Sequence, residues 1–195
     1  TTKRSPTAAA DALDALTAGG IISDNADLAY NYLGTGEDIN PIFSQFEITP
    51  RAIIDEDFIS LIEELSDPRE DFIFRSIPFS GGQRKPGDYF SETTSPVKLV
   101  SYLEELFLRA EAQLRTSGAG SAQPLLEEAV RLSMDQLSFG EISPEDADTY
   151  IANQVQLAGD FDADLKMLIT QKYIALFTSP EPWADFRRTD FPNLV

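Results

Sequence analysis

Aromatic side chains beside amide and carboxylate groups are concentrated in two segments, 21–47 and 70–96, that lack helical periodicity. The candidates in these segments are Tyr30, Asn31, Tyr32, Phe43 and Tyr89. Soluble sugars and peptides are bound by apolar or aromatic faces and a few directed hydrogen bonds, usually in a concave site. We therefore predict that residues of this set contact a ligand. For any single ring, the alternative that it only anchors a long loop to the scaffold is slightly favoured.

The segment 165–192 contains the only tryptophan of the chain and two adjacent arginines among carboxylates. Tryptophan stacks well on sugar rings, but aromatic residues at helix ends more often serve packing, so we favour a core or interhelix position for Trp183. Forked guanidinium groups bind carboxylates through charge-assisted hydrogen bonds, and we prefer such internal pairs to phosphate or carboxylate ligands. The arginines are Arg187 and Arg188, and their expected partners are Asp185, Glu181 and Glu104.

The charge balance excludes several kinds of partner. The 195 residues include 15 Lys and Arg against 33 Asp and Glu, a net charge of −18. Such a field repels phosphate backbones and anionic lipid, so we expect no nucleic-acid partner and no adsorption of the protein surface to a membrane. A well-solvated acidic surface is the simplest explanation, and adaptation to a salty habitat is an alternative.

Cysteine and histidine are both absent, which excludes disulfides, Cys/His zinc sites and Ser-His-Asp catalysis. A glycosidase pair of carboxylates is compatible with the residue types, but no nucleophile motif or phosphate-binding glycine loop accompanies them. We therefore predict a binding protein and not an enzyme, with no cofactor and no metal. Calcium at the segment 23–27 stays an open alternative, although that segment lacks EF-hand spacing.

Apolar residues at three- and four-residue intervals predict six helices. Their approximate ranges are 6–18, 48–66, 96–114, 122–137, 145–154 and 165–177. Thr49 and Asp162 are the expected N-caps of the second and the last of these helices. After the last helix, residues 178–180 are expected to stop it, and a compact turn follows that holds the tryptophan and the arginines.

The segment 97–138 is predicted to form an antiparallel helical hairpin, because the break at 116–120 is short and the alanines Ala110, Ala112 and Ala129 allow close approach. Its pattern resembles one tetratricopeptide unit, and the helices within 143–192 could supply a second pair. We predict an all-α chain in which 1–195 is a single domain, with 21–47 and 70–96 as loop excursions.

Three separated segments then resemble successive motifs of the SusD/RagB family of nutrient-binding outer-membrane lipoproteins. They are SYLEELFLRAEAQLR at 101–115, AVRLSMDQL at 129–137 and LITQKYIALFTSPEPWADFRRTDFP at 168–192. The order and approximate spacing also match, and Asn40-Pro41 and Asp67-Pro68-Arg69 fit the middle portion of the family. The resemblance marks as structural-motif positions Glu104, Glu111, Gln171, Trp183, Asp185, Arg187 and Arg188.

This resemblance implies a mostly helical fold of tetratricopeptide-like pairs, with long loops forming a ligand surface. It implies a lipid-anchored protein of the outer-membrane surface that passes an oligosaccharide or peptide to a SusC-type TonB-dependent transporter. Members of the family are longer, so we expect this chain to be the later-middle part of a larger protein whose signal and anchor lie outside it. The rival hypothesis, an intracellular tetratricopeptide scaffold that binds protein segments, stays open.

Overall fold

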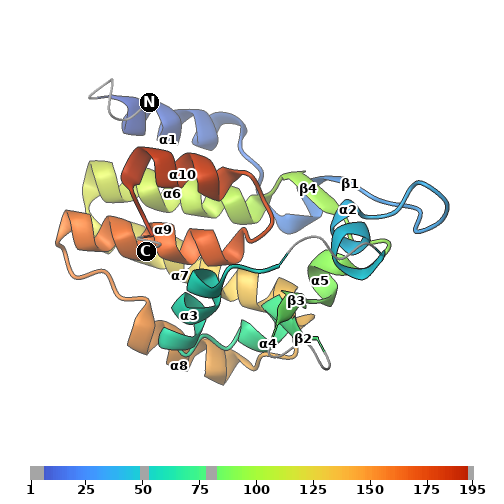
Figure 1. The fold of residues 1–195 in the computed structure, drawn as a ribbon. Helices are drawn as coiled ribbons and strands as arrows, with labels where there is room; N and C mark the ends of the chain where they lie inside the picture. Colours follow the sequence, from blue (N-terminus) through green and yellow to red (C-terminus); the bar gives the residue numbers. More distant parts are fainter. Residues whose placement is uncertain (1–6, 49–52, 78–82, 193–195) are drawn as a thin grey trace.

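The computed structural model describes residues 7–48, 53–77 and 83–192. In these ranges long helices form a layered body, and short strands and helices gather at one end of it (Figure 1). The early elements are α1 (Ala8–Gly19), η1 (Asp24–Ala26), β1 (Leu28–Tyr30), α2 (Pro41–Phe43), η2 (Ser44–Ile48), α3 (Glu56–Glu64), α4 (Glu70–Ile73), β2 (Phe74–Ser76), β3 (Arg84–Pro86), α5 (Asp88–Ser91) and β4 (Val97–Val100). The later ones are α6 (Tyr102–Ser117), α7 (Ala119–Ser138), α8 (Pro144–Gln154), α9 (Phe161–Ala175) and α10 (Glu181–Thr189).

The predicted hairpin is present as α6 and α7, and it forms the centre of the body (Figure 1). A single residue, Gly118, separates the two helices, and its φ of 85° lies in the left-handed region that glycine adopts without a steric penalty. Ala110 and Ala129 are fully buried, and Ala112 is 5% exposed, as the close packing of the two helices requires. The mostly helical fold expected from the sequence is therefore confirmed.

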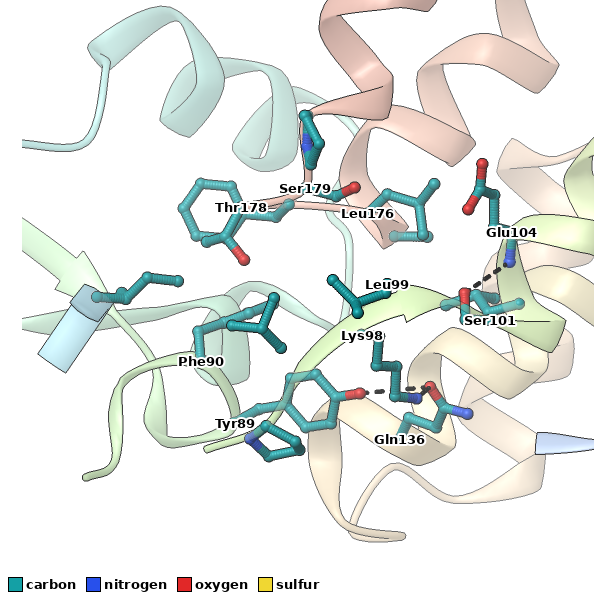
Figure 2. A pocket seen from close by; sticks show the side chains of 17 residues that line it. Tyr89, Phe90, Lys98, Leu99, Ser101, Glu104, Gln136, Leu176, Thr178 and Ser179 are labelled. Atoms are coloured by element: carbon teal, nitrogen blue, oxygen red, sulfur yellow. Dashed lines mark hydrogen bonds between the residues drawn. The ribbon is translucent and has the colours of Figure 1, made fainter. Parts of the chain in front are cut away.

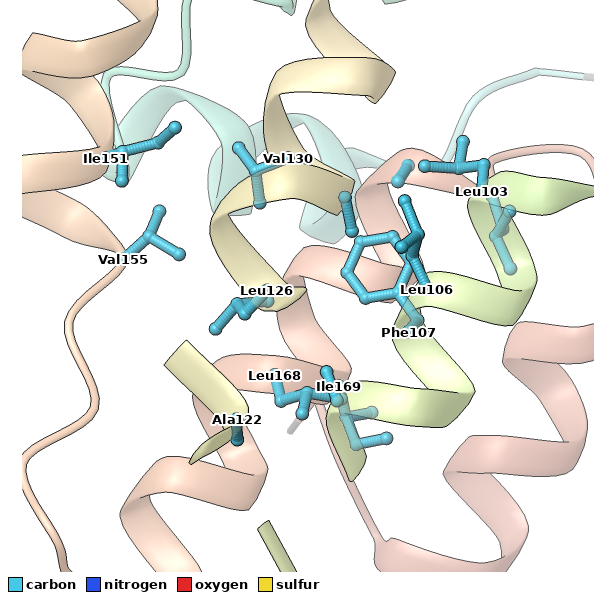
Figure 3. Packing of buried hydrophobic residues seen from close by; sticks show 14 of the residues in the cluster. Leu103, Leu106, Phe107, Ala122, Leu126, Val130, Ile151, Val155, Leu168 and Ile169 are labelled. Atoms are coloured by element: carbon cyan, nitrogen blue, oxygen red, sulfur yellow. The ribbon is translucent and has the colours of Figure 1, made fainter. Parts of the chain in front are cut away.

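A first apolar cluster joins α6, α7, α8 and α9 (Figure 3). Phe107, Leu126 and Leu168 of this cluster have no exposed surface. The cluster also includes the fully buried Val155, which follows α8. Burying a side chain of this size contributes about 1.5–3 kcal/mol each. A second cluster surrounds Phe58 of α3 and includes Ile174 of α9. Because α9 supplies residues to both clusters, it is covered on nearly all sides.

A buried polar network ties the loop between α3 and α4 to the helical core. Arg69 is fully buried and forms an ion pair with Asp67 at 2.5 Å. The guanidinium also donates to Gln171 Oε1 at 2.7 Å and to Ser133 Oγ at 3.1 Å. The hydroxyl of Tyr150 donates to Asp67 at 2.8 Å and accepts from the Gln171 amide at 3.0 Å. Gln171 thus has a structural position that links three other elements.

A second network, made of charged side chains, fixes α10 against α6 and α9. Asp185 pairs with Lys172 of α9 at 2.8 Å and with Arg188 at 2.6 Å. Arg188 continues to Glu111 of α6, which also pairs with Arg115 at 2.8 Å. Burial alone would raise the pKa of Glu111, but the hydrogen bonds and positive charge of Arg188 and Arg115 outweigh it and hold the pKa below its ordinary value.

Several predicted boundaries are wrong, and in each case a cap explains the observed one. The helix expected over 48–66 is α3, which begins only at Glu56 because Asp55 accepts a hydrogen bond from the Asp57 amide. Thr49, the expected cap, lies outside the described residues. The last long helix begins at Phe161 with Asp160 as its cap, and not at 165 with Asp162.

The region expected to be a turn after α9 contains the helix α10. The two predicted loop excursions also contain regular structure, since β1 pairs with β4 and β2 pairs with β3, both antiparallel. The helical start expected at Ser95-Pro96 is also wrong, because the residues that follow form the strand β4. Leu99 belongs to β4 and is 60% exposed, and α6 begins after it, at Tyr102.

Candidate functional site

A groove lies where β4 and α5 approach the end of α9. Its volume is about 110 Å³. Figure 2 shows its wall, with Leu99 in the middle, Tyr89 and Gln136 on one side and Glu104 on the other. We call it the Tyr89 groove, and its lining comprises Ile42, Tyr89, Phe90, Pro96, Val97, Lys98, Leu99, Ser101, Leu103, Glu104, Gln136, Ala175, Leu176, Phe177, Thr178, Ser179 and Pro180.

Two separate hydrogen bonds position the groove wall formed by β4 and the start of α6. Ser101 is the N-cap of α6, and its hydroxyl accepts from the Glu104 amide at 3.2 Å. Asp27, just before β1, accepts from the Tyr102 amide at 2.7 Å. Asp27 also pairs with Lys98 at 2.9 Å. The pairing of β1 with β4 and the cap of α6 thus fix Lys98 and Glu104, six residues apart in the sequence, on two sides of the groove.

The Tyr89 side of the groove is polar and positively charged. Lys98 donates to Gln136 Oε1 at 2.9 Å, and its ammonium lies 5.9 Å from the centre of the Tyr89 ring. The Tyr89 hydroxyl approaches the same Gln136 oxygen at 3.5 Å, which is a weak contact. Burial opposes the charge of Lys98, yet its interactions with Tyr89 and Asp27 outweigh this and raise its pKa, so the ammonium stays protonated.

The opposite side of the groove carries a carboxyl group, that of Glu104. Burial raises its pKa, and although Lys172 acts in the opposite direction, the negative charges of Glu181 and Asp185 raise it further. A half-buried carboxylate of this kind can accept hydrogen bonds from hydroxyl groups. The groove therefore offers a donor, an acceptor and an aromatic ring around an apolar floor, which is the usual composition of a small-molecule site.

The five predicted ligand residues are not brought together in one place. Tyr89 lines the groove, but Tyr30, Asn31 and Tyr32 lie on and after β1, in a neighbouring loop. The Tyr30 and Tyr32 rings meet edge to face at 4.8 Å, and Tyr30 is 52% exposed. A hydrogen bond to Asp38 raises the pKa of Tyr30. Phe43 is half-buried in α2, beside the groove residue Ile42.

Most groove residues were absent from the predicted ligand set, among them Lys98, Gln136 and Leu99. Gln136 belongs to α7, and no local sequence feature separates it from other polar helix residues. Lys98 and Leu99 were hidden because apolar spacing assigned them to the following helix, whereas they form β4. Only the pairing with β1 brings them to the groove.

The motif positions divide into buried and exposed ones. Glu111, Gln171, Asp185 and Arg188 are in the networks described above, and Arg188 has the expected partner Asp185 together with Glu111. Arg187 is exposed and forms no ion pair with any described residue, so its predicted pairing is wrong. The predicted core position of Trp183 is also wrong, because its side chain is 64% exposed.

Two further features concern the part of the chain that the structure describes, namely metal ligands and membrane-spanning helices. No group of three or more carboxylates there is placed to hold a metal ion. In the segment 23–27, Asp27 is instead engaged by Lys98 and by the start of α6. None of the described helices combines the length and the apolar character that crossing a bilayer requires.

Solved structures share this fold. A SusD homologue from Bacteroides fragilis superposes with a TM-score of 0.77 at 18% identity, covering 99% of this chain and 51% of that one. A SusD homologue from Bacteroides thetaiotaomicron gives 0.78 at 24% identity, with coverages of 96% and 47%. A chitin-binding SusD homologue from Flavobacterium johnsoniae gives 0.74 at 23% identity, with coverages of 91% and 44%. The chain thus spans about half the length of these relatives.

A search of curated proteins gave no match. A family model, SusD-like_2, described as "Starch-binding associating with outer membrane", matches residues 1–195. The match covers the whole chain, and it agrees with the folds found among the solved structures. The chain therefore belongs to the SusD-like family.

Proposed function

We propose that the protein carrying this chain is a nutrient-binding protein of the cell surface whose ligand is a glycan or a peptide. The observation that carries the proposal is the match of residues 1–195 to a family described as starch-binding and associating with the outer membrane. A chitin-binding protein among the structural neighbours supports a saccharide ligand. The same match favours this function over the rival intracellular scaffold.

The Tyr89 groove is the part of the described chain best suited to contact such a ligand. It combines the Tyr89 ring with the ammonium of Lys98 and the carboxyl of Glu104. Sugars need this combination, because their rings have apolar faces and their hydroxyl groups both donate and accept hydrogen bonds. None of these groups forms a nucleophile and base pair, so we infer that the protein binds its ligand without chemical conversion.

Delivery of the ligand to a SusC-type TonB-dependent transporter, and attachment to the outer membrane by a lipid anchor, belong to the same proposal. Both rest on membership of the family. Affinity purification of the tagged protein from outer membranes should recover a transporter of this type, and recovery of the protein alone under mild detergent would count against the partnership.

The ligand function can be tested with glycan and peptide arrays, followed by calorimetric titration of the best ligand. We expect Tyr89→Ala to weaken binding about tenfold, a loss of about 1.4 kcal/mol, because the groove loses its ring. Alanine variants of Tyr30 and Tyr32 test the neighbouring loop. The matched control is Phe161→Ala, which removes another partly exposed ring, at the opposite end of α9.

The possible outcomes separate the site from the function. Binding of the wild-type protein that Tyr89→Ala leaves undiminished would remove the groove assignment and keep the function. A wild-type protein that binds nothing on either array would contradict the function itself.

A further inference from the structure

A second hollow adjoins the Tyr89 groove and contains the exposed tryptophan. Its volume is about 350 Å³. Exposure of 64% is unusual for the largest apolar side chain of a folded protein, and exposed aromatic residues in recesses mark binding sites more often than single exposed rings on open surface. We call it the Trp183 hollow, and its lining comprises Tyr173, Leu176, Phe177, Thr178, Ser179, Pro182, Trp183 and Phe186.

The indole ring of Trp183 is held in one orientation. It stacks on Phe186 with centroids 5.9 Å apart and an interplanar angle of 22°. The helix that carries both rings, α10, is fixed by the ion pairs of Asp185 with Lys172 and Arg188. A rigid ring loses little conformational entropy when a ligand covers its other face. The indole is therefore preorganised to stack on a ligand.

The hollow and the groove share one boundary, the turn between α9 and α10. Leu176, Phe177, Thr178 and Ser179 line both recesses. Thr178 has a φ of 74°, a left-handed conformation that is strained for a β-branched residue. Strained residues persist where the surrounding structure holds them, and they are concentrated at ligand sites. A ligand longer than the groove would pass over this turn into the hollow.

The polar groups around the hollow favour a neutral, hydroxyl-rich ligand. The Thr178 hydroxyl is exposed and makes no hydrogen bond to a residue that the structure describes. The Ser179 hydroxyl donates to the Glu181 carboxylate at 2.7 Å and accepts a long hydrogen bond from the Glu181 amide at 3.4 Å, which leaves it one further acceptor position. The cation Lys172, on the same helix as the lining, is buried and paired with Asp185, and Glu181 adds negative charge, so an anionic ligand is disfavoured.

We propose that the Trp183 hollow is a second saccharide subsite, in which the indole stacks on one sugar ring of a chain whose other units occupy the Tyr89 groove. The proposal rests on the proposed function and sharpens it, since it requires an oligosaccharide in place of a single sugar or a peptide. The apolar face of a pyranose ring covers the free face of the indole, while its hydroxyl groups reach Thr178 and Ser179. Because two adjacent subsites bind two parts of one ligand, longer oligosaccharides should bind more tightly than short ones.

Because Trp183 is the only tryptophan of the chain, its fluorescence reports directly on ligand binding in the Trp183 hollow. The experiment titrates the 195-residue chain with chito-oligosaccharides and malto-oligosaccharides of two to six units, and follows tryptophan emission and its quenching by acrylamide. We expect strong quenching in the free protein. Six-unit ligands should shift the emission to the blue and reduce the quenching, because the ligand covers the ring. Two-unit ligands should bind more weakly and change the emission less.

Variants then separate the two subsites by calorimetry. We expect Trp183→Ala to weaken six-unit binding about tenfold and to abolish its advantage over two-unit ligands, whereas Trp183→Phe retains part of it. Phe161→Ala, which removes a ring at the far end of α9, should behave as wild type. If Trp183→Ala fails to fold, the emission measurements on the unaltered chain still decide the matter.

Three results would overturn the subsite while leaving the proposed function in place. The first is oligosaccharide binding with unchanged tryptophan emission and quenching. The second is binding of peptides alone. The third is weak acrylamide quenching before any ligand is added, which would show that another protein surface covers the ring. If no saccharide and no peptide binds, the proposed function falls together with the subsite.

Discussion

Most buried ionisable side chains among the described residues are engaged with one another, and this pairing explains why charged residues can lie in the core. Arg69 has no exposed surface, and Lys172 is only 2% exposed. Taking such groups out of water costs several kcal/mol each, and only close opposite charges with further hydrogen bonds compensate for this. Burial opposes the charge of Asp67, but Arg69 and the hydrogen bond from Tyr150 outweigh it, and the pKa of Asp67 is held below its ordinary value.

We therefore expect the removal of one member of the Asp67 network to destabilise the protein severely. Arg69→Met leaves the buried carboxylate of Asp67 without its cation, and we expect the free energy of unfolding to fall by about 3–5 kcal/mol. Urea denaturation at pH 7 measures this. Arg131→Ala is the matched control, since its partners Glu127 and Asp148 are partly exposed and such pairs contribute about 0–1 kcal/mol. Equal losses in the two variants would contradict this account of the network.

At the scale of elements, capping side chains decide where the helices begin. Apolar spacing located α6, α7, α8 and α9 but extended α6 backwards through Leu99, because a helical period and the first residues of a short strand can share apolar residues. Ser101 followed by Glu104 is the local signal for the true start. The pairing of β4 with β1, some seventy residues earlier, could not be read from either segment alone.

The cap of α6 gives a prediction at this scale. Ser101→Ala removes the acceptor of the Glu104 amide, and we expect a loss of about 1 kcal/mol in the free energy of unfolding. Because Ser101 and Glu104 also line the Tyr89 groove, ligand affinity should fall as well. Ser121→Ala, at an exposed serine of α7, should change stability by less than about 0.5 kcal/mol. Stability of Ser101→Ala equal to that of the control would show that Asp27 alone caps the helix.

At the scale of the whole molecule, the helices form a body that carries two recesses near one end. The groove and the hollow meet at the turn after α9, close to the strands β1 and β4 (Figure 1). Around this body the net charge is −18, which favours solubility but makes the compact state repel itself. Dissolved salt screens this repulsion, so we expect salt to affect the stability of this protein more than that of a protein with no net charge.

This charge predicts a dependence of stability on salt. Screening lengths fall from about 10 Å at 0.1 M salt to about 3 Å at 1 M, so added sodium chloride should raise the midpoint of thermal unfolding at pH 7. Differential scanning calorimetry from 0.05 to 1 M measures the rise. Near pH 4.2, where the net charge vanishes, the rise should be smaller. A midpoint that does not change with salt at pH 7 would show that self-repulsion is unimportant, and would count against adaptation to a salty habitat.

The sequence by itself determined the helical class, the hairpin of α6 and α7 and the family, because helical period and family motifs are local or ordered along the chain. The ligand roles of Tyr30, Asn31, Tyr32, Phe43 and Tyr89 all stay predictions, and of these five only Tyr89 lines the groove. The tertiary structure decided that Trp183 faces solvent and that Arg188 reaches Glu111, 77 residues away. It also decided that Lys98 and Gln136 meet at one groove. Exposure and long-range contacts depend on how the elements pack together, and no local pattern records that.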